Sequence, residues 1–268
     1  MTASIRWLGG ATMEMHLGSF RVLTDPVLAE GPVAFHMDEH PSTGESGVPI
    51  ERRAPLPSLD VEGLDVLLLS HVHSDHFDAV ARERVPRTLW GLAPAEHVPQ
   101  LERWGFEVIE GTIAGEEHHI ERAGEILRIY VLPARHSHEA ATSATLGAVN
   151  GYLIEHEIVR RTLRIAWTGD TVWFDELPAA LTQRGLVDVL IPHLGAVGRD
   201  GPRGLMSMDA AQAAQLIEAV RPRLVMPVHH HTFSHYTEPV EALVARLAGS
   251  PHHDVLRFVE EGDVVRLD

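Results

Sequence analysis

The chain has 268 residues and a net charge of −16, which argues against nucleic acid or an anionic membrane surface as its main partner. It contains no cysteine, which excludes disulfides, thiolate catalysis and cysteine-based zinc sites. No apolar run approaches the roughly 18 residues of a membrane span, and charged residues interrupt the apolar N-terminus, so we expect no membrane insertion, no secretory signal and a cytoplasmic location.

The first third of the chain predicts short strands followed by a long loop. Ser4–Leu8, Thr12–Leu17 and Phe20–Leu23 are apolar or alternating, with glycines between them. Residues 30–63 are rich in Pro and Gly and show little periodicity, so they predict a loop of the length that is usually functional or mobile. Val66–Leu69 is a continuous apolar run, typical of a strand buried on both faces.

The remaining two thirds predict a mixture of strands and helices. Strands are expected at Ile126–Leu132, Tyr152–Glu155, Leu163–Thr168, Val187–Ile191, Leu224–Val228 and Asp254–Val259. Helices are expected where apolar residues recur at helical spacing, in Ala95–Trp104, Met208–Val220 and Val240–Leu247. No linker divides the chain, so we expect a single domain over residues 1–268, of the α/β (α+β) class.

Four of the predicted strands end in a histidine or an aspartate. These residues are His71, His136, Asp170 and His229. The loops at strand ends carry the functional site in many α/β folds, so four such ends on one edge would bring these side chains together. The chain has 19 histidines, and this arrangement decides which of them matter.

The strongest local signal is the segment His71-Val72-His73-Ser74-Asp75-His76, directly after the buried strand. Neutral imidazole is the commonest protein ligand for zinc and similar metals. His71 and His73 lie two residues apart on an extended loop and can point to the same side, whereas Asp75 and His76 turn toward a second position. One loop can therefore address two metal ions, but it needs further ligands from elsewhere in the chain.

The later strand ends would supply those ligands. His136 is favoured over His138 because it directly follows its strand. Asp170 is the natural bridging carboxylate, and its alternative role is the N-cap of a helix starting near Val172. One more ligand is expected among three consecutive histidines, His229, His230 and His231.

With these residues in this order, the chain resembles the metallo-β-lactamase fold superfamily over nearly its whole length. The motif His71-x-His73-x-Asp75-His76 matches the superfamily's defining signature. Within the superfamily, the chain is similar to the branch containing L-ascorbate-6-phosphate lactonase and N-acyl-phosphatidylethanolamine-hydrolysing phospholipase D. That similarity is carried by the segments Trp7–Thr12, Leu23–Val27, Trp167–Thr171 and Pro227–Phe233.

The resemblance implies a four-layer αββα sandwich with a dinuclear metal site at one edge. One ion would be held by His71, His73 and His136, and the other by Asp75, His76 and His229. Asp170 would bridge the two ions, and Asp75 and Asp170 would be the catalytic residues. Zinc is the expected metal, with manganese or iron as alternatives.

The resemblance also implies hydrolysis of an ester, lactone or phosphodiester of a small molecule by a metal-bridging hydroxide. We expect two further histidines, His193 and His231, to contact the substrate. His193 is an addition to the pattern of this branch. Two other functions would use the same residues, an iron-dependent oxidoreductase and a non-catalytic metal-binding protein. The second would be expected to lose ligands, whereas all seven are present here. Nothing in the sequence specifies an oligomeric state.

Overall fold

The computed structural model describes residues 3–158 and 161–267, and two β-sheets dominate it. The first sheet has seven strands: β1 (Ala3–Gly9), β2 (Thr12–Leu17), β3 (Phe20–Thr24), β6 (Val66–Leu68), β7 (Gly91–Pro94), β8 (Ile109–Thr112) and β15 (Val264–Arg266). The second has six strands: β9 (Glu117–Arg122), β10 (Glu125–Pro133), β11 (Asn150–Ile158), β12 (Arg161–Trp167), β13 (Val189–Ile191) and β14 (Leu224–Val225).

The helices are short. They are α1 (Ala79–Arg84), α2 (Val98–Arg103), α3 (Ala140–Leu146), α4 (Leu177–Thr182), α5 (Ala210–Val220) and α6 (Glu241–Leu247), with 3₁₀ turns at Ala95–His97 and His253–Val255. No helix within the described ranges has the length and apolar character needed to cross a membrane.

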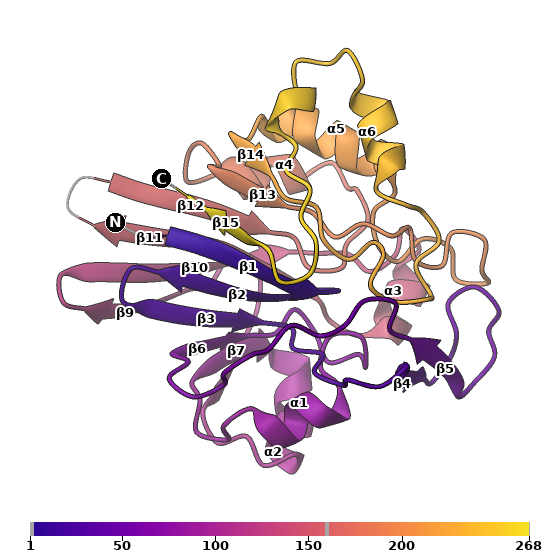
Figure 1. Ribbon diagram of the computed structural model, residues 1–268, viewed down its shortest axis with the longest axis horizontal. Helices are drawn as coiled ribbons and strands as arrows, with labels where there is room; N and C mark the ends of the chain where they lie inside the picture. Colours follow the sequence, from indigo (N-terminus) through magenta and orange to yellow (C-terminus); the bar gives the residue numbers. More distant parts are fainter. Residues whose placement is uncertain (1–2, 159–160, 268) are drawn as a thin grey trace.

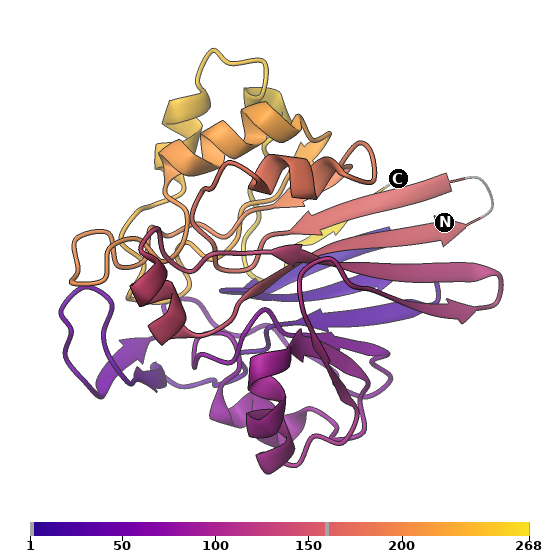
Figure 2. The same ribbon diagram turned by 180° about the vertical axis from the view of Figure 1, so that it is seen from behind.

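The two sheets pack face to face, and helices cover both outer faces (Figure 1). In the seven-stranded sheet the order is β15-β1-β2-β3-β6-β7-β8, and in the six-stranded sheet it is β14-β13-β12-β11-β10-β9. Helices α1 and α2 lie on the outer side of the first sheet, and α4, α5 and α6 on the outer side of the second (Figure 2). This arrangement is the four-layer αββα sandwich expected from the sequence.

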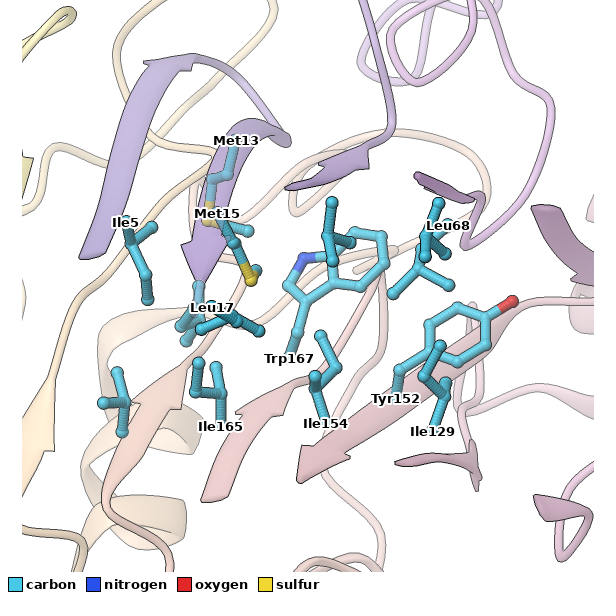
Figure 3. Packing of buried hydrophobic residues seen from close by; sticks show 14 of the residues in the cluster. Ile5, Met13, Met15, Leu17, Leu68, Ile129, Tyr152, Ile154, Ile165 and Trp167 are labelled. Carbon is cyan, nitrogen blue, oxygen red and sulfur yellow. The ribbon is translucent and has the colours of Figure 1, made fainter. Parts of the chain in front are cut away.

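The main core lies between the two sheets, where alternate residues of each strand point inward (Figure 3). The Tyr152 and Trp167 rings stack there, with ring centroids 5.7 Å apart. The Tyr152 hydroxyl donates a hydrogen bond of 2.8 Å to the carbonyl of Leu69. Strand β11 is thereby tied to the end of β6, directly before the histidine-rich loop, so the core fixes where that loop begins.

Helix α5 shows why the outer layers form. Its buried residues recur every three to four positions and cover the six-stranded sheet. Asp209 caps the helix by accepting a 2.8 Å hydrogen bond from the backbone N–H of Gln212. The helix predicted over Met208–Val220 is therefore confirmed, with its start two residues later.

Three of the expected elements need correction. The segment Asp254–Val259 is not a strand, because only Leu256 forms a bridge, to Val225, and the last strand is β15, paired with β1. The helix expected over Ala95–Trp104 is split, since a new helical segment begins at Val98 after the 3₁₀ turn, with Pro99 in its first turn.

The strand expected over Leu224–Val228 ends at Val225, just before a proline that has no N–H for a ladder. The loop over residues 30–63 also has structure of its own. It contains a hairpin of β4 (Val33–Met37) and β5 (Val48–Glu51), which packs toward the loops at the site edge through a small apolar cluster.

Candidate metal centre

Side chains that follow four different strands meet in one buried cluster. The donor atoms of His71, His73 and His136 lie within 4.8 Å of one another, and we call these residues the three-histidine group. A second set of donors lies beside it, and we call its members the carboxylate group: Asp75, His76, Asp170 and His229. The rings of His71 and His76, 4.0 Å apart, join the two groups.

Each histidine of the first group has one nitrogen occupied by the surrounding protein. The Nε2 of His73 lies 3.0 Å from the carbonyl of Leu146, and the Nδ1 of His136 lies 3.0 Å from the carbonyl of Met206. A carbonyl oxygen can only accept, so those nitrogens carry the protons. The unprotonated nitrogens, His73 Nδ1 and His136 Nε2, face one another at 3.3 Å.

Asp25 fixes two more imidazoles from behind. Its carboxylate accepts hydrogen bonds from the Ser70 hydroxyl and, at 2.6 Å, from His76 Nδ1. Because the Ser70 hydroxyl donates its only proton to Asp25, it accepts from His71 Nδ1 at 2.9 Å. The Nε2 atoms of His71 and His76 are buried and have no hydrogen-bond partner among the described residues.

The carboxylate group has the spacing of a metal site. Asp170 Oδ2 lies 3.4 Å from His76 Nε2, and Asp170 Oδ1 lies 3.6 Å from His229 Nε2. Asp75 Oδ2 lies 3.8 Å from His229 Nε2 and 3.9 Å from His76 Nε2. Ligand atoms about 2.0–2.2 Å from one tetrahedral zinc ion would lie about 3.3–3.6 Å from one another. The donors therefore fit a divalent metal with small adjustments.

Two unusual backbone positions bring these donors together. Gly169 has φ +61°, and a Cβ there would lie 2.5 Å from the carbonyl oxygen of Asn150, so only glycine allows the turn that presents Asp170. His229 has φ +62°, and its N–H donates to the carbonyl of Gly10 at 3.0 Å. Its Nδ1 lies 3.2 Å from the carbonyl of Leu194, which leaves Nε2 toward the two aspartates.

In the three-histidine group and at Asp170 the electrostatics match the protonation states that metal ligands need. Burial lowers the pKa of His73 to about 4 and lowers the pKa of His71 well below its ordinary value, so both imidazoles are neutral at pH 7. Burial alone would raise the pKa of Asp170, but His229 and His76 outweigh it and hold that pKa well below its usual range. Neutral imidazoles and charged carboxylates are the forms that bind metal. At His76 three aspartates outweigh burial and raise the pKa well above its ordinary value, so this ring would lose a proton on binding a metal.

Residues 20–230 match the family model described as the beta-lactamase superfamily domain. The chain belongs to this superfamily. It is 26% identical over 260 residues to N-acyl-phosphatidylethanolamine-hydrolyzing phospholipase D 1 of Caenorhabditis elegans, covering 88% of this chain and 67% of that protein. It is 27% identical over 238 residues to a metal-dependent hydrolase of Thermococcus onnurineus, covering 85% of each.

Among solved structures, an isothiocyanate hydrolase from Delia radicum gut bacteria superposes with a TM-score of 0.79 at 20% identity, over 98% of each chain. At that identity the likeness shows the fold alone. The superfamily assignment made from the motif is thus confirmed by family model, relatives and architecture.

In this beta-lactamase-superfamily chain, the geometry favours one of each set of alternatives that the sequence left open. His136 joins the three-histidine group, whereas His138 is exposed and lies 3.0 Å from the amide nitrogen of Gln212. Asp170 is not a helix N-cap, because the next helix along the described chain, α4, begins at Leu177. His229 is the one of the three consecutive histidines that reaches the carboxylate group.

The orientation of His229 comes from its own backbone conformation and not from the strand before it. Strand alternation does not orient it, because β14 ends at Val225 and His229 itself has a left-handed backbone. His230 and His231 instead pack beside Trp7, and His231 Nε2 lies 3.0 Å from Glu261. This position does not support the expected contact of His231 with substrate.

The structure does not support the expected contact of His193 with a substrate. The side chain is completely buried and lies behind Asp170, with Nδ1 2.9 Å from Asp170 Oδ1. Both of its ring nitrogens are hydrogen-bonded to protein atoms, Nδ1 to Asp170 and Nε2 to Trp167.

Sequence reasoning assigned no role to Asp25, His235 or Tyr236. The Nε2 of His235 lies 3.2 Å from Asp75 Oδ2, and the buried Tyr236 hydroxyl has no hydrogen-bond partner among the described residues. Asp25 could have been found by the rule that found the others, since it directly follows β3. His235 and Tyr236 lie further into the loop after His229, where no pattern marks them.

Proposed function

We propose that this protein is a dinuclear metal-dependent hydrolase acting on an ester, lactone or phosphodiester of a small molecule. Metal-dependent hydrolysis rests on the superfamily and on relatives that carry this name over 85% of the chain. The observation that carries the dinuclear part is the set of imidazoles that each use one nitrogen on a protein acceptor and leave the other in the cluster.

The seven donors divide between two ions. His71, His73 and His136 would hold one ion, and Asp75, His76 and His229 the other. We assign Asp170 to the position between them because its Oδ2 lies 3.4 Å from His76 Nε2, and the His76 ring lies 4.0 Å from that of His71. Zinc is favoured by the imidazole-rich set, and manganese and iron are compatible with it.

When bound, two divalent ions about 3.5–4 Å apart would supply a hydroxide nucleophile near neutral pH and stabilise the oxyanion that develops. The protein's part is to hold the site rigid and dry. His71, Asp75 and His229 are at most 6% exposed, which keeps bulk water away from the charges and strengthens them. Asp75 and Asp170 supply two negative charges, and Asp75 is placed to accept a hydrogen bond from the nucleophile.

A cavity beside His136 supports a small substrate. Its volume is about 410 Å³, within the usual range of small-molecule sites. Small and apolar residues form most of its wall, among them Ala95, Ile113, Pro133 and Val149. The net charge of −16 disfavours a long polyanion. The superfamily's hydrolase relatives and the complete donor set favour this function over an iron-dependent oxidoreductase or a non-catalytic metal-binding protein.

The test starts from protein purified without added metal. Its metal content is measured, and it is then assayed against a panel of esters, lactones and phosphodiesters. We expect hydrolysis of at least one class, abolished by a chelator and restored by zinc or manganese. Hydrolysis that survives complete metal removal would contradict the proposal, as would metal-loaded protein inactive on every class.

A further inference from the structure

His193 differs from the five candidate histidine ligands in one respect: both of its ring nitrogens are hydrogen-bonded, and one of them accepts from a protein N–H. Its Nδ1 lies 2.9 Å from Asp170 Oδ1, and its Nε2 lies 2.6 Å from Trp167 Nε1. An indole N–H can only donate. His193 Nε2 therefore accepts and carries no proton, and the single proton of the neutral ring is on Nδ1, from which it is donated to Asp170.

This tautomer has a consequence for metal binding. His71, His76 and His229 each leave a buried Nε2 without a hydrogen-bond partner in the described part of the chain. His193 leaves neither nitrogen, although its donor atom lies within 4.8 Å of those of His76, Asp170 and His229. Its distance from these atoms would allow His193 to be a metal ligand. Its hydrogen bonds indicate instead that it holds the proposed ligand Asp170 in place.

The surroundings hold the ring in place. The backbone N–H of His193 donates to the Thr168 hydroxyl at 3.1 Å, and the residue bridges to Val228 in a parallel ladder. Its ring stacks on that of His229 with an interplanar angle of 12°. Trp167 is itself fixed in the core by stacking on Tyr152. The core thus holds Trp167, Trp167 holds the ring of His193, and His193 in turn sets the direction of the Asp170 carboxylate.

We propose that Trp167 and His193 are positioning residues that act through Asp170: the indole selects the Nδ1–H tautomer of His193, and that N–H orients the carboxylate toward the metal. A neutral donor leaves Asp170 its full negative charge, whereas a cationic imidazolium would compete with the ion. The inference rests on the proposed function insofar as Asp170 is a metal ligand. The tautomer itself does not depend on it.

The first test reads the tautomer directly in the unmodified protein. ¹⁵N NMR of histidine-labelled protein distinguishes the two neutral forms, and the His193→Asn variant assigns the signal by its disappearance. We expect the Nδ1–H form of His193 both without metal and after adding zinc. An Nε2–H form, or a shift of either nitrogen to a metal-bound position on adding zinc, would overturn the proposal.

The second test compares two substitutions at the same position. Asn can place an amide N–H near the position of Nδ1, whereas Leu offers no donor. Loss of an outer hydrogen bond to a metal ligand typically costs about 10–100-fold in metal affinity. We expect His193→Leu to weaken zinc binding by about that factor and to leave KM unchanged, with His193→Asn restoring most of the affinity. Zinc affinity is measured by competition with a chelating dye.

A matched control separates this effect from the loss of any buried imidazole. His156 is also completely buried, and it lies toward the opposite end of β11 from the site, paired with Glu125. His156→Leu should lower the melting temperature and leave zinc affinity unchanged. If His193→Leu keeps wild-type zinc affinity, the role of His193 is purely structural. If the variant raises KM alone, His193 contacts the substrate. If the Asn and Leu variants lose one ion equally, His193 is a metal ligand. Each result overturns the proposal.

The outcomes also separate this inference from the proposed function. If the wild-type protein binds no metal but His193 has the Nδ1–H form, the proposed function fails and the orienting unit stands. If the protein binds two ions and both His193 variants bind them normally, the orienting role fails and the proposed function stands.

Discussion

The three-histidine group and the carboxylate group share one support and differ in the others. The shared support is Asp25, which bonds His76 directly and His71 through Ser70. His73 is half-buried, and its outer nitrogen bonds to the carbonyl of Leu146 at the end of α3, a helix with no buried side chain. In the carboxylate group, His76 is held by the completely buried Asp25, and Asp170 by His193 and Trp167. One group thus depends partly on a peripheral segment, and the other is fixed by the core.

We infer from this difference that the two groups have different roles in catalysis. A ligand set anchored to peripheral backbone can adjust when substrate enters, and the cavity beside His136 adjoins that set. A set anchored by buried charged hydrogen bonds keeps its geometry, as a group that positions a nucleophile must. We expect the first ion to exchange readily and the second to be retained.

The largest expected effect comes from Asp170, which the account places between the groups. Asp170→Asn keeps the volume and removes the charge, so we expect turnover to fall by at least about 10²–10³-fold, the loss typical of one preorganised catalytic group. Circular dichroism should be unchanged because Gly169, not the carboxylate, sets the turn. Wild-type turnover in this variant would remove Asp170 from the catalytic site.

The next effect distinguishes His229 from its neighbours. His229→Ala should lose one ion per chain and nearly all activity, because its Nε2 faces both aspartates. His231→Ala serves as the control, since its ring bonds to Glu261 instead, and it should keep both ions. The metal content per chain, measured by mass spectrometry, shows which of the two histidines is the ligand. Metal loss in the His231 variant with retention in the His229 variant would reverse the assignment.

A smaller effect is expected from Asp25, which touches no proposed ion. Asp25→Asn keeps an acceptor for Ser70 and weakens the charged bond to His76, so zinc affinity should fall by about 10–100-fold. Because Asp25 bonds His76 directly and reaches His71 only through Ser70, the loss should be larger for the ion of the carboxylate group than for the other ion. Equal weakening of both ions would show that the two groups do not differ as proposed.

The smallest effect is kinetic. When metal-loaded protein is mixed with excess chelator, release should occur in two phases, the faster one assigned to the three-histidine group. Spectra of a cobalt-substituted protein can follow both phases, and His136→Ala, which removes one ligand of that group, should abolish the fast phase selectively. Release in a single phase from the wild-type protein would contradict the distinction between the groups.

Local patterns in the sequence predicted the strand ends and the donors, and the resemblance to the superfamily supplied the architecture. Apolar runs ending in His71, His136 and Asp170 mark strand ends, and the topology then brings those ends together. The seven proposed ligands could therefore be named before the structure, although their roles as ligands stay predictions.

The supports of the ligands could not be predicted in the same way. The role of His193 depends on which atoms its two nitrogens meet, one of them on Trp167, and no spacing in the chain records that contact. The hairpin of β4 and β5 and the last strand β15 are short and pair through tertiary contacts, so local pattern gave no signal for them.

The central claim is that two ions bind per chain, one in each group. Crystals of protein purified without added metal, with anomalous diffraction collected above and below the zinc edge, test it most directly. The account predicts two anomalous peaks about 3.5–4 Å apart, one bound by His71, His73 and His136 and one by Asp75, His76 and His229, with Asp170 between them. The absence of a peak at the three histidines, in protein that is active, would contradict it.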